Sequence, residues 1–174
     1  MIVTTDELRQ ICEQAEAEYP NECCGVIMTR GGERQALRFR NMQDAMHRMD
    51  PKRFPRTAQR AYYVGLDDHR RMDALVTVGF AVSIIYHSHP DAAAYFSPTD
   101  RDNAAPRPQT NATDHRPSGP PPKREPVWPG VTYLVVSVMN GRATESAAFR
   151  WDTVAEDFTE IHKEALVSSK DSAR

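Results

Sequence analysis

Apolar side chains near the start of the chain recur three or four residues apart over 4–19, as on one face of an α-helix. Thr4, with Glu7 three residues later, has the spacing of a capping box at the start of that helix. Pro20 and Asn21 end it. The pattern therefore predicts an amphipathic first helix.

Short apolar runs predict the strands of a sheet. The predicted strands cover residues 23–28, 35–40, 80–86, 131–139 and 143–151. The run over 80–86 is strongly apolar and β-branched, which is typical of a central strand. Asn140-Gly141 between the last two runs is a strong signal of a two-residue hairpin. Helices and strands together predict an α/β fold.

Two further helices are predicted, one before and one after the strand over 80–86. Asp67 or Asp68 is placed to cap a helix that stops before Gly79, and residues 62–64 before it fit a strand. Ser97 has the character of an N-cap, with Pro98 in the first helical position, so a short helix should follow as far as about residue 105.

Two other segments lack the pattern of a regular element. Residues 41–61 are charged, rich in methionine and broken by prolines, while 106–126 holds seven prolines in 21 residues and a single apolar residue. We expect both to be irregular insertions in one domain over 1–167. Residues 152–166 fit either a helix or a further strand, and 168–174 a frayed tail.

Composition narrows the function. The chain has 174 residues, 40% of them apolar, which is enough for one core. With 22 Lys and Arg against 24 Asp and Glu, the formal charge of −2 lacks the basic surplus that nucleic-acid binding needs. We expect no membrane span or secretory signal, since the apolar runs are too short. Three cysteines, two of them adjacent, do not indicate a disulfide framework, so a cytoplasmic location fits best.

The residues with the clearest chemistry follow the predicted central strand. His87 and His89 are two residues apart on an extended chain, so both side chains project to one side. Asp100, at the third position of the short helix, can turn its carboxylate back toward them. Three protein ligands with one open position are the form of a catalytic zinc site. The alternative is two solvated histidines in a turn beside an ordinary helix start.

A resemblance to a known family adds to this interpretation. His87-Ser88-His89-Pro90, with Ser97 and Asp100 at fixed spacing behind it, resembles the signature of the JAMM (MPN+) metalloprotease family. Upstream, Pro20-Asn21-Glu22-Cys23-Cys24-Gly25 resembles the glutamate segment of that family. The order of elements over about 1–150 is similar too, most closely to the small prokaryotic members. The resemblance implies a single domain of cytidine-deaminase-like architecture, with a central mixed β-sheet flanked by helices.

The resemblance also implies a role for each site residue. His87, His89 and Asp100 would bind Zn²⁺, Glu22 would act as general base, and Ser97 would steady the oxyanion. Zinc lowers the pKa of a bound water to about 7, and a glutamate beside it can pass the proton to the leaving amine. Ser97 has a competing role as the helix N-cap, and Glu22 alone could be a solvated acid after a helix.

Members of the family cleave amide bonds at the C-terminal tails of ubiquitin-like proteins. The expected substrate is therefore the Gly-Gly tail of a ubiquitin-like or sulfur-carrier β-grasp protein, cut at a peptide or an isopeptide bond. An open strand edge can hold such a tail by β-augmentation. We expect one or both of the insertions 41–61 and 106–126 to contact this substrate, unless 106–126 is an inert insertion.

Two other functions stay open. A non-catalytic MPN-type scaffold would share the fold and usually lacks the metal ligands, which are intact here. A zinc deaminase would be signalled by His-x-Glu and Pro-Cys-x-x-Cys strings, neither of which occurs. The oligomeric state, including a homodimer, is not fixed by the sequence.

Overall fold

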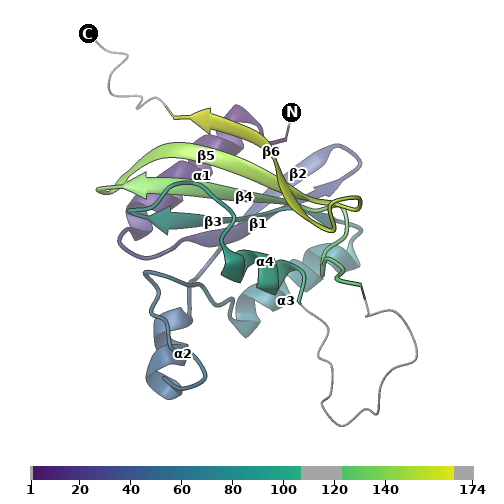
Figure 1. Ribbon diagram of the computed structural model, residues 1–174. Coiled ribbons are helices and arrows are strands. Elements are labelled where there is room, and N and C mark those ends of the chain that lie inside the picture. The colour runs from purple at the N-terminus through teal and green to yellow at the C-terminus, as the bar shows by residue number, and fades with distance from the viewer. Residues whose placement is uncertain (1, 107–122, 167–174) are drawn as a thin grey trace.

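A mixed six-stranded β-sheet with helices on both faces forms the protein (Figure 1). The computed structural model describes residues 2–106 and 123–166. The strands are β1 (Cys24–Arg30), β2 (Glu33–Phe39), β3 (Ala81–Pro90), β4 (Thr132–Met139), β5 (Arg142–Asp152) and β6 (Asp157–Ala165). The helices are α1 (Thr5–Glu18), α2 (Gln43–Met49), α3 (Leu66–Thr77) and α4 (Pro98–Ala104).

The strand order is β2-β1-β3-β4-β5-β6. β3 and β4 run parallel to each other, and every other neighbouring pair is antiparallel. Short turns join the antiparallel pairs β1–β2, β4–β5 and β5–β6, whereas β2, α2 and α3 lie in the chain between the antiparallel neighbours β1 and β3. The parallel pair needs a long crossover, and α4 lies on it. The predicted α/β fold with a central mixed sheet is confirmed.

α1 covers one face of the sheet. Its start has the predicted capping box: the Thr4 hydroxyl accepts from the Glu7 backbone N–H at 3.2 Å, and the Glu7 carboxylate accepts from the Thr4 N–H at 2.8 Å. Ile11 and Ala15, one turn apart, are buried against apolar residues of β1, β3, β4 and β5. Burial of this stripe holds the helix on the sheet.

α3 and α4 cover the opposite face (Figure 1). Met72 of α3 belongs to one buried cluster there, and Ala104 of α4 belongs to a second. Side chains alternate along a strand, so β3 sends Ile84 and Tyr86 toward α1 and Ile85 toward the α3 and α4 side. By the same alternation, the odd-numbered residues that follow in β3 face α4.

Gly25 in β1 allows a close approach between strands. A Cβ atom at this position would overlap the Tyr86 hydroxyl and the Leu37 carbonyl oxygen. The Tyr86 hydroxyl donates to Gln14 Oε1 at 2.7 Å, and Gln14 Nε2 donates to the Cys24 carbonyl at 3.1 Å. These buried bonds fix the start of β1 against both α1 and β3.

The segment 41–61 is not wholly irregular, because it contains α2. Residues 62–64 form no strand of their own: Val64 makes only an isolated bridge with Asn41. α3 begins after Gly65 instead of being capped by Asp67 or Asp68. The Asp68 carboxylate is used elsewhere, since it accepts from the Arg40 backbone N–H at 2.9 Å and pairs with Arg71 at 2.7 Å.

Within 152–166, residues Asp157–Ala165 form β6, so of the two alternatives considered for this segment the further strand is confirmed and the helix is wrong. β6 pairs with β5 at the edge of the sheet, with a register shift at which Ile161 has no partner. Such a bulge interrupts the alternation of a strand, which explains the helix-like spacing of Phe158 and Ile161. Most of the proline-rich insertion (107–122) and the tail (168–174) lie outside the described residues.

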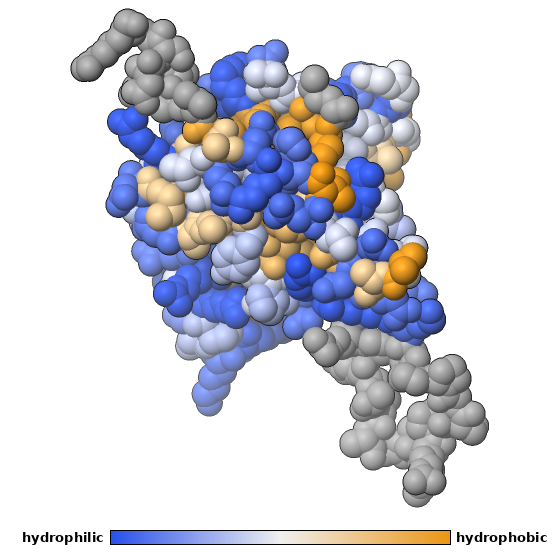
Figure 2. Space-filling view, turned by 45° about the horizontal axis from the view of Figure 1, so that its top comes forward, coloured by the Kyte–Doolittle hydropathy of each residue, from blue (hydrophilic) through white to orange (hydrophobic). Residues whose placement is uncertain are grey.

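Hydrophilic residues dominate the face of the molecule shown in Figure 2, where apolar residues form small separate patches. The most exposed large apolar side chains are dispersed over the fold: Met49 in α2, Leu66 in α3 and Val154 between β5 and β6. Singly exposed apolar residues of this kind are ordinary. Among the helices in 2–106 and 123–166, none is long and apolar enough to cross a membrane.

Candidate metal centre

His87 and His89 lie near the end of β3, and their side chains are on the face of the sheet that α4 covers. β3 continues to Pro90, beyond the predicted end of the strand, because His87 and His89 pair with Val135 and Ser137 of β4. Only 1% of His87 and 8% of His89 is exposed. Their Nε2 atoms are 3.2 Å apart. The two side chains therefore converge as predicted, and their burial contradicts the alternative of two solvated histidines.

Asp100 reaches the histidines from α4. The Ser97 hydroxyl accepts from the Asp100 backbone N–H at 3.2 Å, and Asp100 Oδ2 accepts from the Ser97 N–H at 2.8 Å, so the two form a capping box. This turns the carboxylate back toward β3. Its Oδ1 is 3.5 Å from His87 Nε2, and its Oδ2 is 3.6 Å from His89 Nε2.

The spacing of these ligand atoms fits one metal ion. Tetrahedral zinc with Zn–N bonds of about 2.0–2.1 Å places two ligand nitrogens about 3.3 Å apart. The two Nε2 atoms are 3.2 Å apart, and all three ligand atoms lie within 4.8 Å of one another. His89 Nδ1 is 3.1 Å from the Ala93 carbonyl oxygen, which can only accept, so the bond assigns the proton to Nδ1 and leaves Nε2 with a free lone pair.

The electrostatics of the site favour a cation. Burial opposes ionisation of Asp100, but the adjacent His87 outweighs it and holds the pKa of Asp100 far below its usual range. Burial also opposes protonation of His87, but the Asp100 carboxylate outweighs it and raises the pKa of His87. The Asp100 carboxylate, nearly closed off from water, thus favours a positive charge at or between the two imidazoles. A proton or a metal ion can supply it.

Glu22 lies beside this group, between α1 and β1. Its backbone N–H donates to the Ala58 carbonyl at 2.8 Å, and its carbonyl accepts from Asn41 Nδ2 at 2.9 Å. Only 7% of the residue is exposed. Burial raises the pKa of Glu22, and the nearby His87 and His89 partly oppose that rise. Glu22 is therefore a buried acid next to the histidines, not a solvated acid after a helix.

Ser88 ties the glutamate segment to the histidine strand. Its side chain points away from the two imidazoles, and its hydroxyl accepts from the Cys23 backbone N–H at 2.8 Å. The Ser88 N–H donates to the Cys23 carbonyl at 3.1 Å. Because Cys23 directly follows Glu22, these two bonds set the distance between the glutamate and the histidines.

The two roles considered for Ser97 are compatible. As the N-cap of α4, its hydroxyl oxygen accepts from the Asp100 N–H. A hydroxyl has one donor proton in addition to its acceptor lone pairs. Capping therefore leaves the Ser97 proton available, and the N-cap role does not compete with a donor role toward a substrate oxygen.

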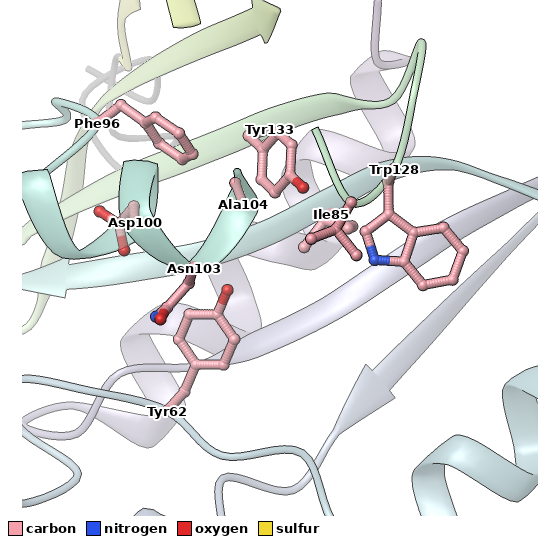
Figure 3. A pocket seen from close by; sticks show the side chains of 9 residues that line it. Tyr62, Ile85, Phe96, Asp100, Asn103, Ala104, Trp128 and Tyr133 are labelled. Carbon is pink, nitrogen blue, oxygen red and sulfur yellow. The ribbon is translucent and has the colours of Figure 1, made fainter. Parts of the chain in front are cut away.

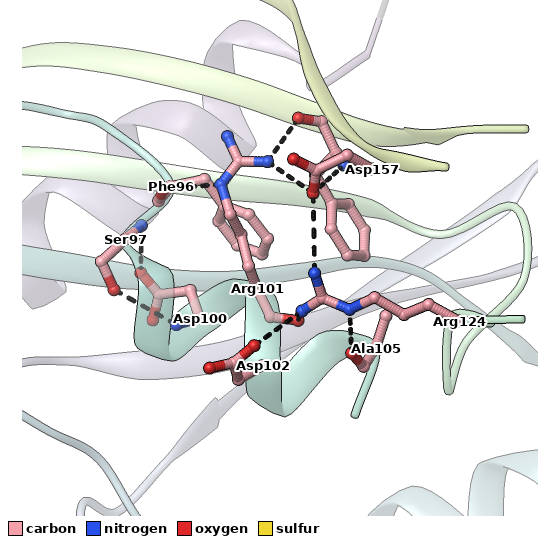
Figure 4. A network of polar contacts seen from close by, with 9 residues as sticks. Phe96, Ser97, Asp100, Arg101, Asp102, Ala105, Arg124 and Asp157 are labelled. Atoms are coloured by element: carbon pink, nitrogen blue, oxygen red, sulfur yellow. Dashed lines mark hydrogen bonds and ion pairs between the residues drawn. The ribbon is translucent and has the colours of Figure 1, made fainter. Parts of the chain in front are cut away.

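A cluster of arginines anchors the end of α4 (Figure 4). Arg124 donates to the carbonyl oxygen of Ala105 and, at 2.6 Å, to that of Arg101, and it pairs with Asp102 at 2.9 Å. Arg101 pairs with Asp157 of β6 at 2.8 Å. Positive side chains at a helix C-terminus satisfy its last carbonyls and its dipole. The network fixes the helix whose first turn carries Asp100.

An Arg124→Ala variant should bind zinc about 10-fold more weakly, as is typical when an outer contact that orients a metal ligand is removed. The reason is that the end of α4 loses the bonds from Arg124 to the carbonyl oxygens of Arg101 and Ala105 and the ion pair with Asp102. Titration with a zinc-buffered indicator measures the affinity. Lys123→Ala is the matched control, because Lys123 is 77% exposed and makes only a surface ion pair with Glu156. Equal zinc affinity in both variants would contradict an anchoring role.

Two aromatic residues at the site carry no signal in the sequence. The Tyr62 ring packs against His87 with 5.2 Å between centroids, and the Tyr95 ring packs edge-on against His89 at 5.0 Å. Neither belongs to a recognisable spacing motif. Tyr62 reaches the site only because the chain after α2 returns across the end of β3.

Comparisons with known proteins agree with this geometry. The family model described as prokaryotic homologs of the JAB domain matches residues 4–152. A solution structure of a protein from Salinibacter ruber is 28% identical to this chain. The match covers 100% of this chain and 95% of the other chain, with a TM-score of 0.53. A solution structure of a protein from Desulfitobacterium hafniense is 17% identical and shows the same fold. That match covers 91% of this chain and 87% of the other chain, with a TM-score of 0.53. No curated protein matches.

The matched span contains Glu22, the two histidines of β3 and Asp100, and it ends with β5. The described structure brings the last three of these residues together as a group that can hold a metal ion. The small prokaryotic JAMM/MPN family inferred from the sequence is thereby confirmed, and the chain belongs to the prokaryotic homologs of the JAB domain.

Proposed function

We propose that this protein is a zinc-dependent peptidase or isopeptidase that hydrolyses an amide bond after the C-terminal Gly-Gly of a ubiquitin-like or sulfur-carrier β-grasp protein. One observation carries the proposal: two buried Nε2 atoms and a carboxylate converge at metal-ligand spacing, with the buried Glu22 beside them. The JAB family includes metalloproteases and inactive members, and the intact ligand set of this chain favours an active one.

The proposed mechanism assigns a task to each residue. His87, His89 and Asp100 would hold zinc, which supplies Lewis acidity and an activated water in such sites. Glu22 takes a proton from the attacking water and delivers it to the leaving amine nitrogen. The raised pKa of Glu22 suits this task, since a proton shuttle works best with a pKa nearer to neutral pH.

Ser97 is the proposed donor to the developing oxyanion. Its hydroxyl proton is left over from capping, and a positioned donor at this point lowers the barrier by about 3 kcal/mol. The Ala93 carbonyl keeps the His89 ring in the tautomer that presents Nε2. The rings of Tyr62 and Tyr95 flank the two histidines, and this crowding supports glycine, which has no side chain, on the acyl side of the bond.

The experiment combines metal analysis with a cleavage assay. We expect about one zinc per chain in protein purified without chelator, and cleavage of β-grasp proteins extended beyond Gly-Gly. A His89→Ala variant should lose both, whereas His162→Ala, in which an exposed histidine of β6 is replaced, should keep both. Absence of bound metal even after zinc is supplied would contradict the proposal and favour a non-catalytic scaffold. Bound zinc without cleavage of any extended β-grasp protein would contradict the proposed substrate.

A further inference from the structure

A cavity of about 120 Å³ lies next to the metal-ligand group, between α4, β3, β4 and the segment that precedes β4 (Figure 3). Its apolar walls come from Ile85, Phe96 and Ala104. The aromatic rings of Tyr62, Trp128 and Tyr133 complete most of the remaining wall. We call this space the aromatic cavity.

The aromatic cavity shares two residues with the candidate metal centre. Asp100 lines it, while the carboxylate of the same residue faces His87 and His89. Tyr62 also lines it, and its ring packs against the His87 ring at 5.2 Å. A substrate whose reacting carbonyl lies at the metal-ligand group can therefore place a neighbouring side chain in the cavity.

The size of the cavity indicates what it can hold. An engineered protein cavity of about 150 Å³ binds benzene. The aromatic cavity, at about 120 Å³, is somewhat smaller, so it has room for one aliphatic side chain such as that of leucine or methionine.

The polar atoms on the walls point to a neutral guest. Within the described residues, the hydroxyls of Tyr62 and Tyr133, the indole N–H of Trp128 and the carboxamide of Asn103 have no hydrogen-bond partner. They are free to contact the backbone of a ligand or water at the mouth. Asp100 is the one charged residue among the described lining residues, and its negative charge disfavours an acidic guest.

We propose that the aromatic cavity binds the side chain of the residue on the amine side of the scissile bond and selects a neutral, medium-sized aliphatic side chain there. This rests on the function proposed above. In that substrate the acyl side ends in Gly-Gly and has no side chain to offer. The residue next to the bond that can fill the cavity is then the first residue of the leaving group.

The first test compares cleavage of β-grasp proteins that end in Gly-Gly-X-Ala, with X as Ala, Leu, Met or Asp. We expect kcat/KM for Leu and Met to exceed that for Ala by about 10-fold or more, as one buried aliphatic group can provide. Asp should be the poorest substrate. In an Ala104→Leu variant, which fills the cavity, the preference for Leu over Ala should disappear.

The matched control is Ala155→Leu, which makes the same change at an exposed position in the turn between β5 and β6. It should keep the preference of the unmodified protein. Equal kcat/KM for all four substrates would overturn the inference while leaving the proposed hydrolase in place. So would an Ala104→Leu variant with unchanged preference.

A second test does not depend on turnover or on zinc. Metal-free protein is titrated with N-acetyl-leucinamide while the indole N–H signal of Trp128 is followed by NMR, with assignment from a Trp128→Phe variant. We expect a saturable shift, absent with N-acetyl-aspartamide and abolished by Ala104→Leu. No shift would overturn the inference. A shift in a protein that cleaves no substrate would support the cavity as a binding site and reject the hydrolase.

Discussion

A Glu22→Gln variant should lose about 10²- to 10⁴-fold in kcat while keeping its zinc, which is the range that a positioned general acid or base contributes. Glutamine preserves the size of the side chain but cannot take a proton from the attacking water. The buried position of Glu22 offers no other acid in its place, since the Asp100 carboxylate is directed at the histidines. Initial rates at saturating substrate, with zinc content measured on the same samples, test this.

Glu160→Gln is the matched control for this variant, because Glu160 is an exposed carboxylate on β6. Its kcat should equal that of the unmodified protein. Retention of more than about a tenth of the activity in Glu22→Gln would argue that the proton moves by another route. Loss of zinc together with activity would mean that Glu22 is a ligand, a role that the structure does not favour.

An Asp100→Asn variant should bind zinc more than 100-fold more weakly, beyond the loss of about 10- to 100-fold that outer contacts cause. The reason is the loss of the one negative ligand, which leaves two neutral imidazoles. The Asn carbonyl oxygen can still accept from the Ser97 backbone N–H, so the start of α4 should persist. Competition with a chelator of known affinity measures the change, and hydrolysis should fall with metal occupancy.

The control for this variant separates metal binding from folding. Thermal unfolding of the metal-free proteins, followed by circular dichroism, should show a single cooperative transition for Asp100→Asn, at a lower midpoint than for the unmodified chain because the contact between the Asp100 carboxylate and His87 is lost. Asp102→Asn in the same helix, whose carboxylate pairs with Arg124 instead of the histidines, should keep its zinc affinity within about 10-fold. Wild-type affinity in Asp100→Asn would show that Asp100 is not a ligand.

The metal-ligand group could be predicted from the sequence because two short-range patterns determine most of its geometry. Two histidines two residues apart in a strand must share a face, and an acid at the third position of a capped helix must turn back toward the helix start. The contributions of Tyr62, Tyr95 and Trp128 could not be predicted. Their places depend on how long segments return over the sheet, which no spacing in the sequence encodes.

The same distinction holds for the fold. α1 and the hairpin of β4 and β5 have strong local signals, a capping box and Asn140-Gly141, and both were predicted. α2 has few apolar residues and is held by tertiary bonds, such as the Gln43 side chain donating to the Arg56 carbonyl at 2.8 Å. β6 has mostly exposed side chains and a bulge at Ile161, so it lacks the period of a half-buried strand.

The candidate site draws on three places far apart in the chain: the start of β1, the end of β3 and the first turn of α4. In the unfolded chain, only His87 and His89 stay close to each other, because they are two residues apart in the sequence. Zinc would therefore bind the native state much more tightly than the unfolded state. By linkage, free zinc at 100 times its dissociation constant then stabilises the fold by about 2.7 kcal/mol. The temperature or denaturant concentration at which this protein unfolds would thus depend on the free zinc concentration as well as on the amino-acid sequence.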